Sequence, residues 1–148
     1  MRHRIFIAIN LPEDIKKRLA IYQSKWPDLP ARWTKKENLH ITLEFLGDTT
    51  DEELLDVLKN TKELAEKQEP YFITLNKIAY GPPGKAPRMI WAIGDKSSHV
   101  TLARLKQWEF KKMEQEERPD INEDINLNFE VSSIEVMESE LKRGGPIY

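Results

Sequence analysis

The sequence predicts an α+β fold of two pseudo-symmetric lobes. Each lobe is expected to be an antiparallel-rich sheet with helices on its outer face, and an active-site cleft is expected between the sheets. Three observations lead to this prediction: a length of 148 residues, a strand and helix pattern that occurs twice, and one His-x-Thr-Leu phrase in each copy. A chain of this length is usually one domain with a real core, so residues 1–148 are predicted to be a single bilobal domain.

The first copy of the pattern fills the N-terminal half. Its predicted elements are a strand over 4–10, a helix over 11–26, a strand over 39–46, a helix over 50–67 and a strand over 71–81. The opening strand rests on the alternation of Ile5, Ile7 and Ile9 with more polar neighbours. The second helix begins with Thr50 and Glu53, the spacing of a capping box.

The second copy repeats this order with one piece absent. "RMIWAIG" at 88–94 resembles "RIFIAIN" at 4–10, and "HVTLARL" at 99–105 resembles "HITLEFL" at 40–46. A charged helical stretch over 105–117 and a strand region over 127–138 follow. Only Asp95 to Ser98 stand where the first copy has a helix, and four residues cannot form a parallel crossover. Either the second lobe has a hairpin here, or the natural protein has a segment that this sequence lacks.

Composition limits the classes of function. Lys+Arg 23 against Asp+Glu 25 gives a net charge of −2, which argues against blanket neutralisation of long nucleic acid but allows a local basic pocket. The chain has no cysteine, which excludes disulfides and thiolate metal sites and suits a reducing compartment. The first apolar run is too short to span a bilayer. We therefore expect a cytoplasmic protein that does not bind membranes.

The repeated histidine phrase is the candidate site. Residues i and i+2 of a strand share a face, so His40 lies beside Thr42 and His99 lies beside Thr101. If the two halves are related by a pseudo-twofold axis, both pairs can face one cleft and converge on one anionic group. In-line displacement at phosphorus needs a base on the attacking oxygen and an acid on the leaving oxygen, and histidines serve both purposes near neutral pH. The threonine hydroxyls can donate to the remaining phosphate oxygens.

A metal site is the main chemical alternative for these residues. Strict alternation puts Glu44 on the face of His40, and a histidine and a carboxylate can share an ion. No second carboxylate accompanies His99, and threonine is a poor ligand. We expect neither a metal nor any other cofactor.

These phrases, together with "RIFIAINLP" and "PRMIW", resemble the 2H phosphoesterase superfamily, and in particular its RNA 2′,3′-cyclic phosphodiesterase branch, also called 2′-5′ RNA ligase. The resemblance implies a bilobal α+β fold and metal-independent opening of an RNA-terminal 2′,3′-cyclic phosphate to a 2′-phosphate, reversible as ligation. It implies that His40 is the proton donor, that His99 is the base, and that Thr42 and Thr101 hold the phosphate. It also implies that Arg104 contacts the substrate.

Four further residues are weighed beside the motifs. Phe6 shares a strand face with Ala8 and could stack on a base. Arg88 has the cleft-side parity of its strand and could meet a phosphate. Simple alternation turns Arg104 away from the cleft unless its strand ends or twists. His3 is expected to be an exposed bystander.

The expected partners are RNA ends, including tRNA fragments, or nucleoside 2′,3′-cyclic phosphates, bound by a monomer. The alternative function is a non-catalytic module that binds nucleotides or RNA ends in the same cleft. That alternative predicts binding without turnover.

Overall fold

The chain folds into two compact units, seen in a computed structural model that describes residues 2–142 and 145–147. The first unit comprises the described residues within Met1–Asn10, His40–Phe72 and Glu130–Tyr148. The second comprises Leu11–Leu39 and Ile73–Phe129. Each unit contains antiparallel strands and at least one helix, so the predicted α+β class is confirmed.

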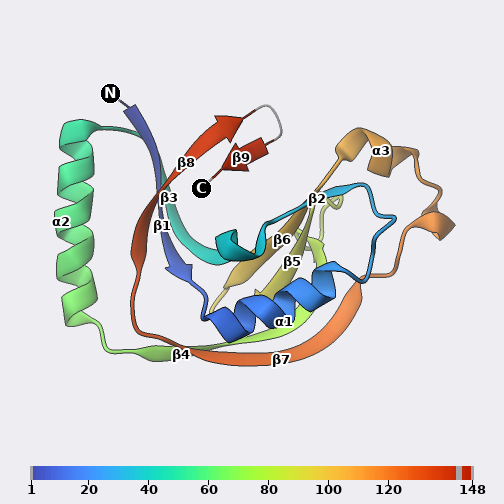
Figure 1. Ribbon diagram of the computed structural model, residues 1–148, viewed down its shortest axis with the longest axis horizontal. Coiled ribbons are helices and arrows are strands. Elements are labelled where there is room, and N and C mark those ends of the chain that lie inside the picture. The colour runs from blue at the N-terminus through green and yellow to red at the C-terminus, as the bar shows by residue number, and fades with distance from the viewer. Residues whose placement is uncertain (1, 143–144, 148) are drawn as a thin grey trace. The chain divides into compact units, whose positions relative to one another are not determined.

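The first unit is a sheet flanked by one helix. Its strands, in spatial order, are β3 (His40–Thr50), β1 (Arg2–Asn10), β8 (Glu135–Lys142) and β9 (Gly145–Ile147), with antiparallel pairs throughout. Helix α2 (Asp51–Lys67) follows β3 directly and lies beside β1 and β3 (Figure 1). The buried apolar side chains of β1 and β3 form the core of this unit: Ile5, Phe6, Ala8, Ile9 and Ile41.

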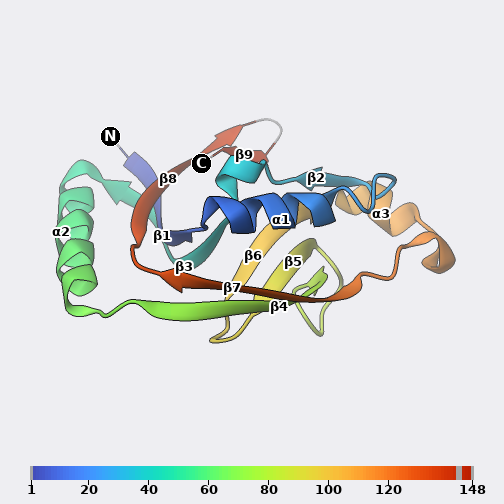
Figure 2. The same ribbon diagram turned by 60° about the horizontal axis from the view of Figure 1, so that its bottom comes forward.

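The second unit is a larger sheet covered by a helix. Its strands, in spatial order, are β7 (Asn122–Val131), β4 (Tyr71–Gly81), β5 (Met89–Gly94), β6 (His99–Leu105) and β2 (Ala31–Trp33). Helix α1 (Glu13–Gln23) lies across β5 and β6 in both views of the chain (Figure 2). It buries Ile15 and Leu19, the helically spaced residues that predicted it. The shorter helices are α3 (Gln107–Lys112), η1 (Lys36–Asn38) and η2 (Gln115–Glu117).

The connection between β5 and β6 is a hairpin. The two strands pair antiparallel, and the Ser98 amide donates to the Asp95 carbonyl at 3.0 Å. Lys96 and Ser97, at the tip, have φ angles of 54° and 59°. Positive φ at both tip residues matches the turn twist that joins neighbouring strands without splaying them. In the sequence as given, Asp95 to Ser98 therefore form the turn of a hairpin.

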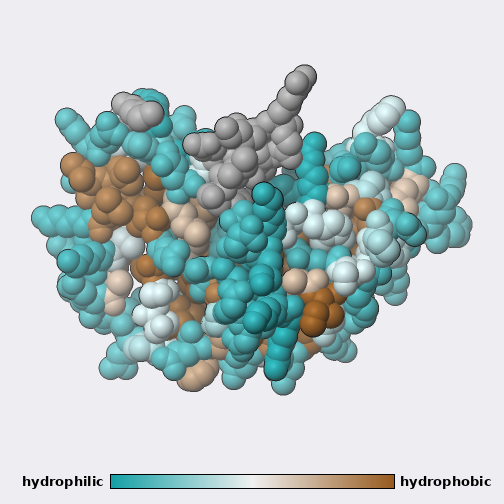
Figure 3. Space-filling view, viewed as in Figure 1, coloured by the Kyte–Doolittle hydropathy of each residue, from teal (hydrophilic) through white to brown (hydrophobic). Residues whose placement is uncertain are grey.

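The start of α2 is fixed by the predicted capping box. The Glu53 amide donates to Thr50 Oγ1 at 3.2 Å, and the Thr50 amide donates to Glu53 Oε1 at 3.1 Å. The rest of α2 is largely exposed, which matches the hydrophobic surface near this helix in Figure 3. The leucines of α2 that are largely exposed are Leu55, Leu58 and Leu64.

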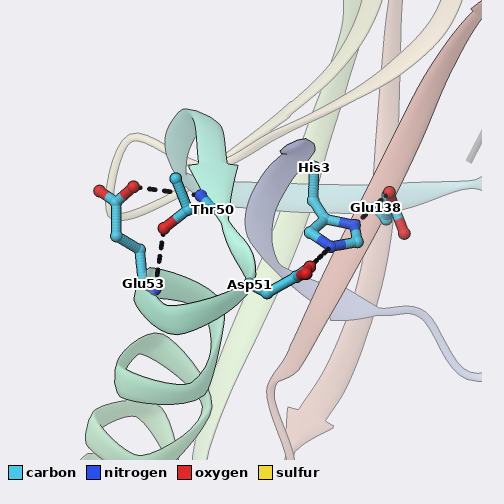
Figure 4. Close-up of polar contacts among 5 residues, drawn as sticks. All are labelled: His3, Thr50, Asp51, Glu53 and Glu138. Carbon is cyan, nitrogen blue, oxygen red and sulfur yellow. Dashed lines mark hydrogen bonds and ion pairs between the residues drawn. The ribbon is translucent and has the colours of Figure 1, made fainter. Parts of the chain in front are cut away.

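His3 connects three elements of the first unit and is not a bystander. Its Nε2 lies 2.6 Å from Asp51 Oδ1 at the start of α2, and its Nδ1 lies 2.8 Å from Glu138 Oε1 on β8 (Figure 4). The side chain is only 16% exposed. These hydrogen bonds, the one to Asp51 first, raise the pKa of His3 above its ordinary value. A ring that contacts a carboxylate at each nitrogen is favoured as the imidazolium, which donates at both.

No helix in the described part of the chain is both long enough and apolar enough to span a bilayer.

Candidate functional site

The first His-x-Thr pair lies at the start of β3. His40 and Thr42 are half-buried, and His40 Nε2 lies 3.1 Å from Thr42 Oγ1. Beneath them the Phe6 ring packs on the imidazole of His40, with ring centroids 5.1 Å apart. The polar atoms of this pair therefore lie close enough together to contact one small anion, and the Phe6 ring closes off the side beneath them.

A β-bulge follows this pair and changes which residues share its face. The register of β1 against β3 pairs Ala8 with Thr42, Ile7 with Glu44 and Phe6 with Phe45. Leu43 has no partner on β1, so the strand gains one residue and its alternation shifts by one. Glu44 consequently lies on the opposite face from His40, and Phe45 lies on the same face. The predicted proximity of Glu44 to His40, on which the metal alternative rested, is wrong.

Phe45 is the site residue that strict alternation missed. Its side chain is 70% exposed, whereas Phe6 is 1% exposed and lies against both Phe45 and His40. A ring with so little exposed surface has no free face for a base, so the expectation that Phe6 is a stacking platform is wrong. Phe6 instead supports the rings above it, and Phe45 has the exposed aromatic face.

The second His-x-Thr pair lies at the start of β6. His99 and Thr101 are half-buried, and the Trp91 indole on β5 stacks on the imidazole with ring centroids 3.8 Å apart and planes at 16°. Burial lowers the pKa of His99 below its ordinary value. A lowered pKa favours the neutral imidazole, the form that can accept a proton.

Trp91 is itself held from behind by Gly81 on β4. A β-carbon at Gly81 would lie 2.5 Å from Cδ2 of the Trp91 indole, a separation that real side chains do not adopt. The indole therefore lies directly on the glycine backbone, with its other face on His99. Only a residue without a side chain leaves this room.

A second β-bulge follows this pair at the equivalent leucine. The register of β5 against β6 pairs Trp91 with Thr101, Ile90 with Ala103 and Met89 with Arg104. Leu102 has no partner, so Arg104 returns to the face of His99 and Thr101. Simple alternation would have turned Arg104 away from the motif. The bulge shifts the alternation of β6 and turns Arg104 toward it. In both strands the residue five positions after histidine, Phe45 or Arg104, joins the face of the motif.

The backbone around this second bulge is clamped by side chains from α1 and from the residue after β2. Thr34 Oγ1 donates to the Thr101 carbonyl at 2.9 Å, and the Thr34 amide donates to the Leu102 carbonyl at 2.9 Å. Gln23 Nε2 donates to the Thr34 and Leu102 carbonyls at 2.8 and 3.0 Å. These bonds satisfy carbonyls that a bulge would otherwise leave unpaired.

Arg88 does not share the face of His99. It precedes β5, and its carbonyl accepts from the Leu105 amide at 2.9 Å. By alternation it has the parity of Ile90 and Ala92, which are fully buried and lie opposite the Trp91 face. The predicted cleft-side parity of Arg88 is therefore wrong. The sequence alone does not indicate that Trp91, rather than Ile90 and Ala92, lies on the same face as His99.

Metal ligands are not grouped in the described residues: within 2–142 and 145–147, no cluster of three or more His, Asp or Glu side chains is placed to hold an ion.

Comparison with known proteins identifies related families and folds. The family described as "LigT like Phosphoesterase" matches residues 9–91, more than half of the chain. The RNA 2′,3′-cyclic phosphodiesterase of Methanocaldococcus jannaschii is 30% identical over 171 aligned positions, which cover 98% of this chain and 96% of the relative.

Solved structures have the same fold. The crystal structure of TT0787 of Thermus thermophilus is 27% identical, with a TM-score of 0.82 over 98% of this chain and 93% of that one. Escherichia coli LigT complexed with 3′-AMP is 22% identical, with a TM-score of 0.70 over 100% of this chain and 94% of that one. At that identity the second likeness concerns the fold alone.

Proposed function

The chain belongs to the LigT-like phosphoesterase family, and we propose that it hydrolyses the 2′,3′-cyclic phosphate at an RNA end to a 2′-phosphate. The observation that carries the proposal is the pair of His-x-Thr strands. Each holds a half-buried imidazole and hydroxyl on one face, and each has a bulge at the following leucine. The name of the M. jannaschii relative supports the substrate.

The two histidines divide the proton transfers. His99, whose pKa burial lowers, takes a proton from the attacking water. The water oxygen bonds to phosphorus as the bond from phosphorus to O3′ breaks, and His40 gives its Nε2 proton to O3′. The products are a 2′-phosphate and a free 3′-hydroxyl. The proposal needs both imidazoles to act on one phosphate, from opposite sides.

The neighbouring residues hold the substrate. The Thr42 and Thr101 hydroxyls donate to the non-bridging oxygens, where charge increases in the transition state. Arg104 contributes a fixed positive charge on the face of Thr101. Phe45 stacks on the base, the role that the sequence suggested for Phe6. The site thus binds sugar phosphate and base through different residues.

We propose that this chemistry needs no metal, because the imidazoles supply both the base and the acid. With the 5′-hydroxyl of a second RNA in place of water, the same groups would form a 2′-5′ phosphodiester as the bond from phosphorus to O3′ breaks. Ligation would therefore be the same ring opening with a different attacking oxygen, and its reverse would cleave a 2′-5′ linkage. The chain has no cysteine and forms no disulfide, so it does not need an oxidising compartment, which supports the proposal of a cytoplasmic location.

The test is turnover of a nucleoside 2′,3′-cyclic phosphate in excess EDTA, with the product separated as 2′- or 3′-phosphate. We expect only the 2′-phosphate, at a rate that EDTA does not change. His40→Ala and His99→Ala should each lower kcat by roughly a hundredfold or more. His3→Gln is the matched control, since His3 contacts Asp51 and Glu138 rather than either motif, and it should keep the wild-type rate.

Three outcomes contradict the proposal. Loss of activity in EDTA that Mg²⁺ or Zn²⁺ restores would assign the chemistry to a metal. A 3′-phosphate product would reverse the assigned leaving group. Nucleotide binding without any turnover would favour the non-catalytic binding module.

A further inference from the structure

Arg32 lies directly opposite Arg104 on a neighbouring strand. It is on β2, whose register against β6 pairs Ala31 with Leu105, Arg32 with Arg104 and Trp33 with Ala103. Directly paired residues of antiparallel strands project their side chains on the same face, with α-carbons about 4.5–5.5 Å apart. Because the bulge at Leu102 puts Arg104 on the face of Thr101, Arg32 lies on that face as well.

Two arginines in this relationship repel each other and favour an anion. Like charges directly opposite each other on neighbouring strands destabilise a sheet. Both side chains are exposed, and within the described residues the Arg32 side chain makes no hydrogen bond or ion pair. A guanidinium is suited to phosphate because it offers paired donors in one plane. The pair is therefore a cationic extension of the face that begins with His99.

We propose that Arg32 binds the phosphodiester that precedes the terminal nucleotide, and that the enzyme therefore prefers RNA ends to mononucleotides. The inference rests on the proposed function, which assigns the terminal cyclic phosphate to the threonines and Arg104. From Thr101 to Arg104 the strand advances by about 7–10 Å at roughly 3.3 Å per residue. Arg32 lies one strand farther on, beyond the terminal phosphate. A nucleoside 2′,3′-cyclic phosphate has no group to place there, whereas an oligonucleotide has one.

The kinetic experiment compares a short RNA ending in a 2′,3′-cyclic phosphate with the mononucleoside 2′,3′-cyclic phosphate of the same base. Wild type should have the higher kcat/KM on the RNA. Arg32→Ala should lower kcat/KM for the RNA roughly tenfold more than for the mononucleotide, and Arg32→Lys should restore part of the difference. Arg18→Ala removes the same charge from an exposed position on α1 and should leave both values unchanged.

A binding experiment separates this inference from the proposed function. It measures fluorescence anisotropy of a labelled single-stranded RNA ending in a 3′-phosphate, which the enzyme does not hydrolyse, over a range of salt concentrations. Loss of one phosphate contact should reduce the slope of log Kd against log salt by about 0.7 in Arg32→Ala. Failure of wild type to hydrolyse either cyclic phosphate would refute the proposed function, whereas an unchanged slope would refute the role of Arg32. Equal losses on both substrates would also refute that role.

Discussion

The indole of Trp91 lies flat on the imidazole of His99, with ring centroids 3.8 Å apart and planes at 16°. This contact takes water away from the imidazole, and burial lowers the pKa of His99 below its ordinary value of 6.5. A histidine that acts as base must be neutral. In a plot of kcat/KM against pH, the fall in activity on the acid side should therefore have its midpoint below pH 6.5; this part of the curve is the acid limb.

Removal of the indole should move that limb. In Trp91→Ala, water returns to the imidazole and the pKa of His99 rises toward its ordinary value, so kcat/KM falls at pH 6 more than at pH 8. The measurement is a pH profile of kcat/KM for a mononucleoside cyclic phosphate. Trp108→Ala, which removes a 71% exposed indole on α3, is the control and should keep the wild-type profile. An identical limb in Trp91→Ala would show that Trp91 does not set the pKa.

Gly81 should tolerate no side chain, because the Trp91 indole lies directly on its backbone. In Gly81→Ala the new β-carbon displaces the indole and, through it, the imidazole of His99. We expect a loss of about 1–3 kcal/mol in the free energy of unfolding, the usual cost of overpacking, together with a lower kcat. Urea denaturation and steady-state kinetics measure the two effects.

A double variant shows whether the effect of Gly81→Ala passes through the indole. The smaller ring of Trp91→Phe makes room for the added methyl group, so Gly81→Ala should cost less stability in the Trp91→Phe background than alone. Additive losses would mean that the methyl group acts through other neighbours.

Phe45 should matter for binding and little for folding. Its ring is 70% exposed, so Phe45→Ala should change the free energy of unfolding by less than about 0.5 kcal/mol. Loss of a stacked base should raise KM by roughly tenfold, since stacking contributes about 1–3 kcal/mol per base. Phe45→Trp should retain the substrate affinity. Phe72→Ala, at a 58% exposed position on β4, is the control; an equal rise in its KM would count against stacking.

The contacts of His3 should make the stability of the first unit depend on pH. Hydrogen bonds to Asp51 and Glu138 raise the pKa of His3, so this stabilisation is complete below pH 6.5 and is lost as the pH rises through the raised value. The pKa of Asp51 is lowered by the same contact. The stabilisation that depends on the ionised Asp51 carboxylate is therefore lost only as the pH falls below 3.8. Urea denaturation of wild type and His3→Gln at several pH values should show the largest difference near pH 6. Curves separated by a constant amount from pH 5 to 9 would contradict this account.

The sequence predicted the elements with local signals and missed those defined by pairing. Thr50 and Glu53 set the start of α2, and the strand over 71–81 was predicted with the bounds of β4. β2 was missed, because three residues carry no periodicity and form a strand only by pairing with β6. The helix predicted over 105–117 is a six-residue α3 followed by η2, and nothing in the structure explains the early end.

The site was predicted as far as strict alternation holds. His40 and Thr42 share a face as expected, and so do His99 and Thr101, because no bulge interrupts either pair. Beyond each leucine the expectation failed, since a bulge depends on the partner strand and leaves no local pattern. The one available signal was the equal offset of Phe45 and Arg104 from their histidines.

The unpaired Leu102 also bears on how β6 keeps its alignment with β5. If β6 slipped by one residue and became regular, Arg104 would turn toward the side of Val100, which is 0% exposed. A guanidinium forced into an apolar interior costs several kcal/mol, so the charge itself penalises the straighter strand. Arg104→Leu would remove that penalty, and the variant strand would then have two competing alignments where the natural one has a single alignment.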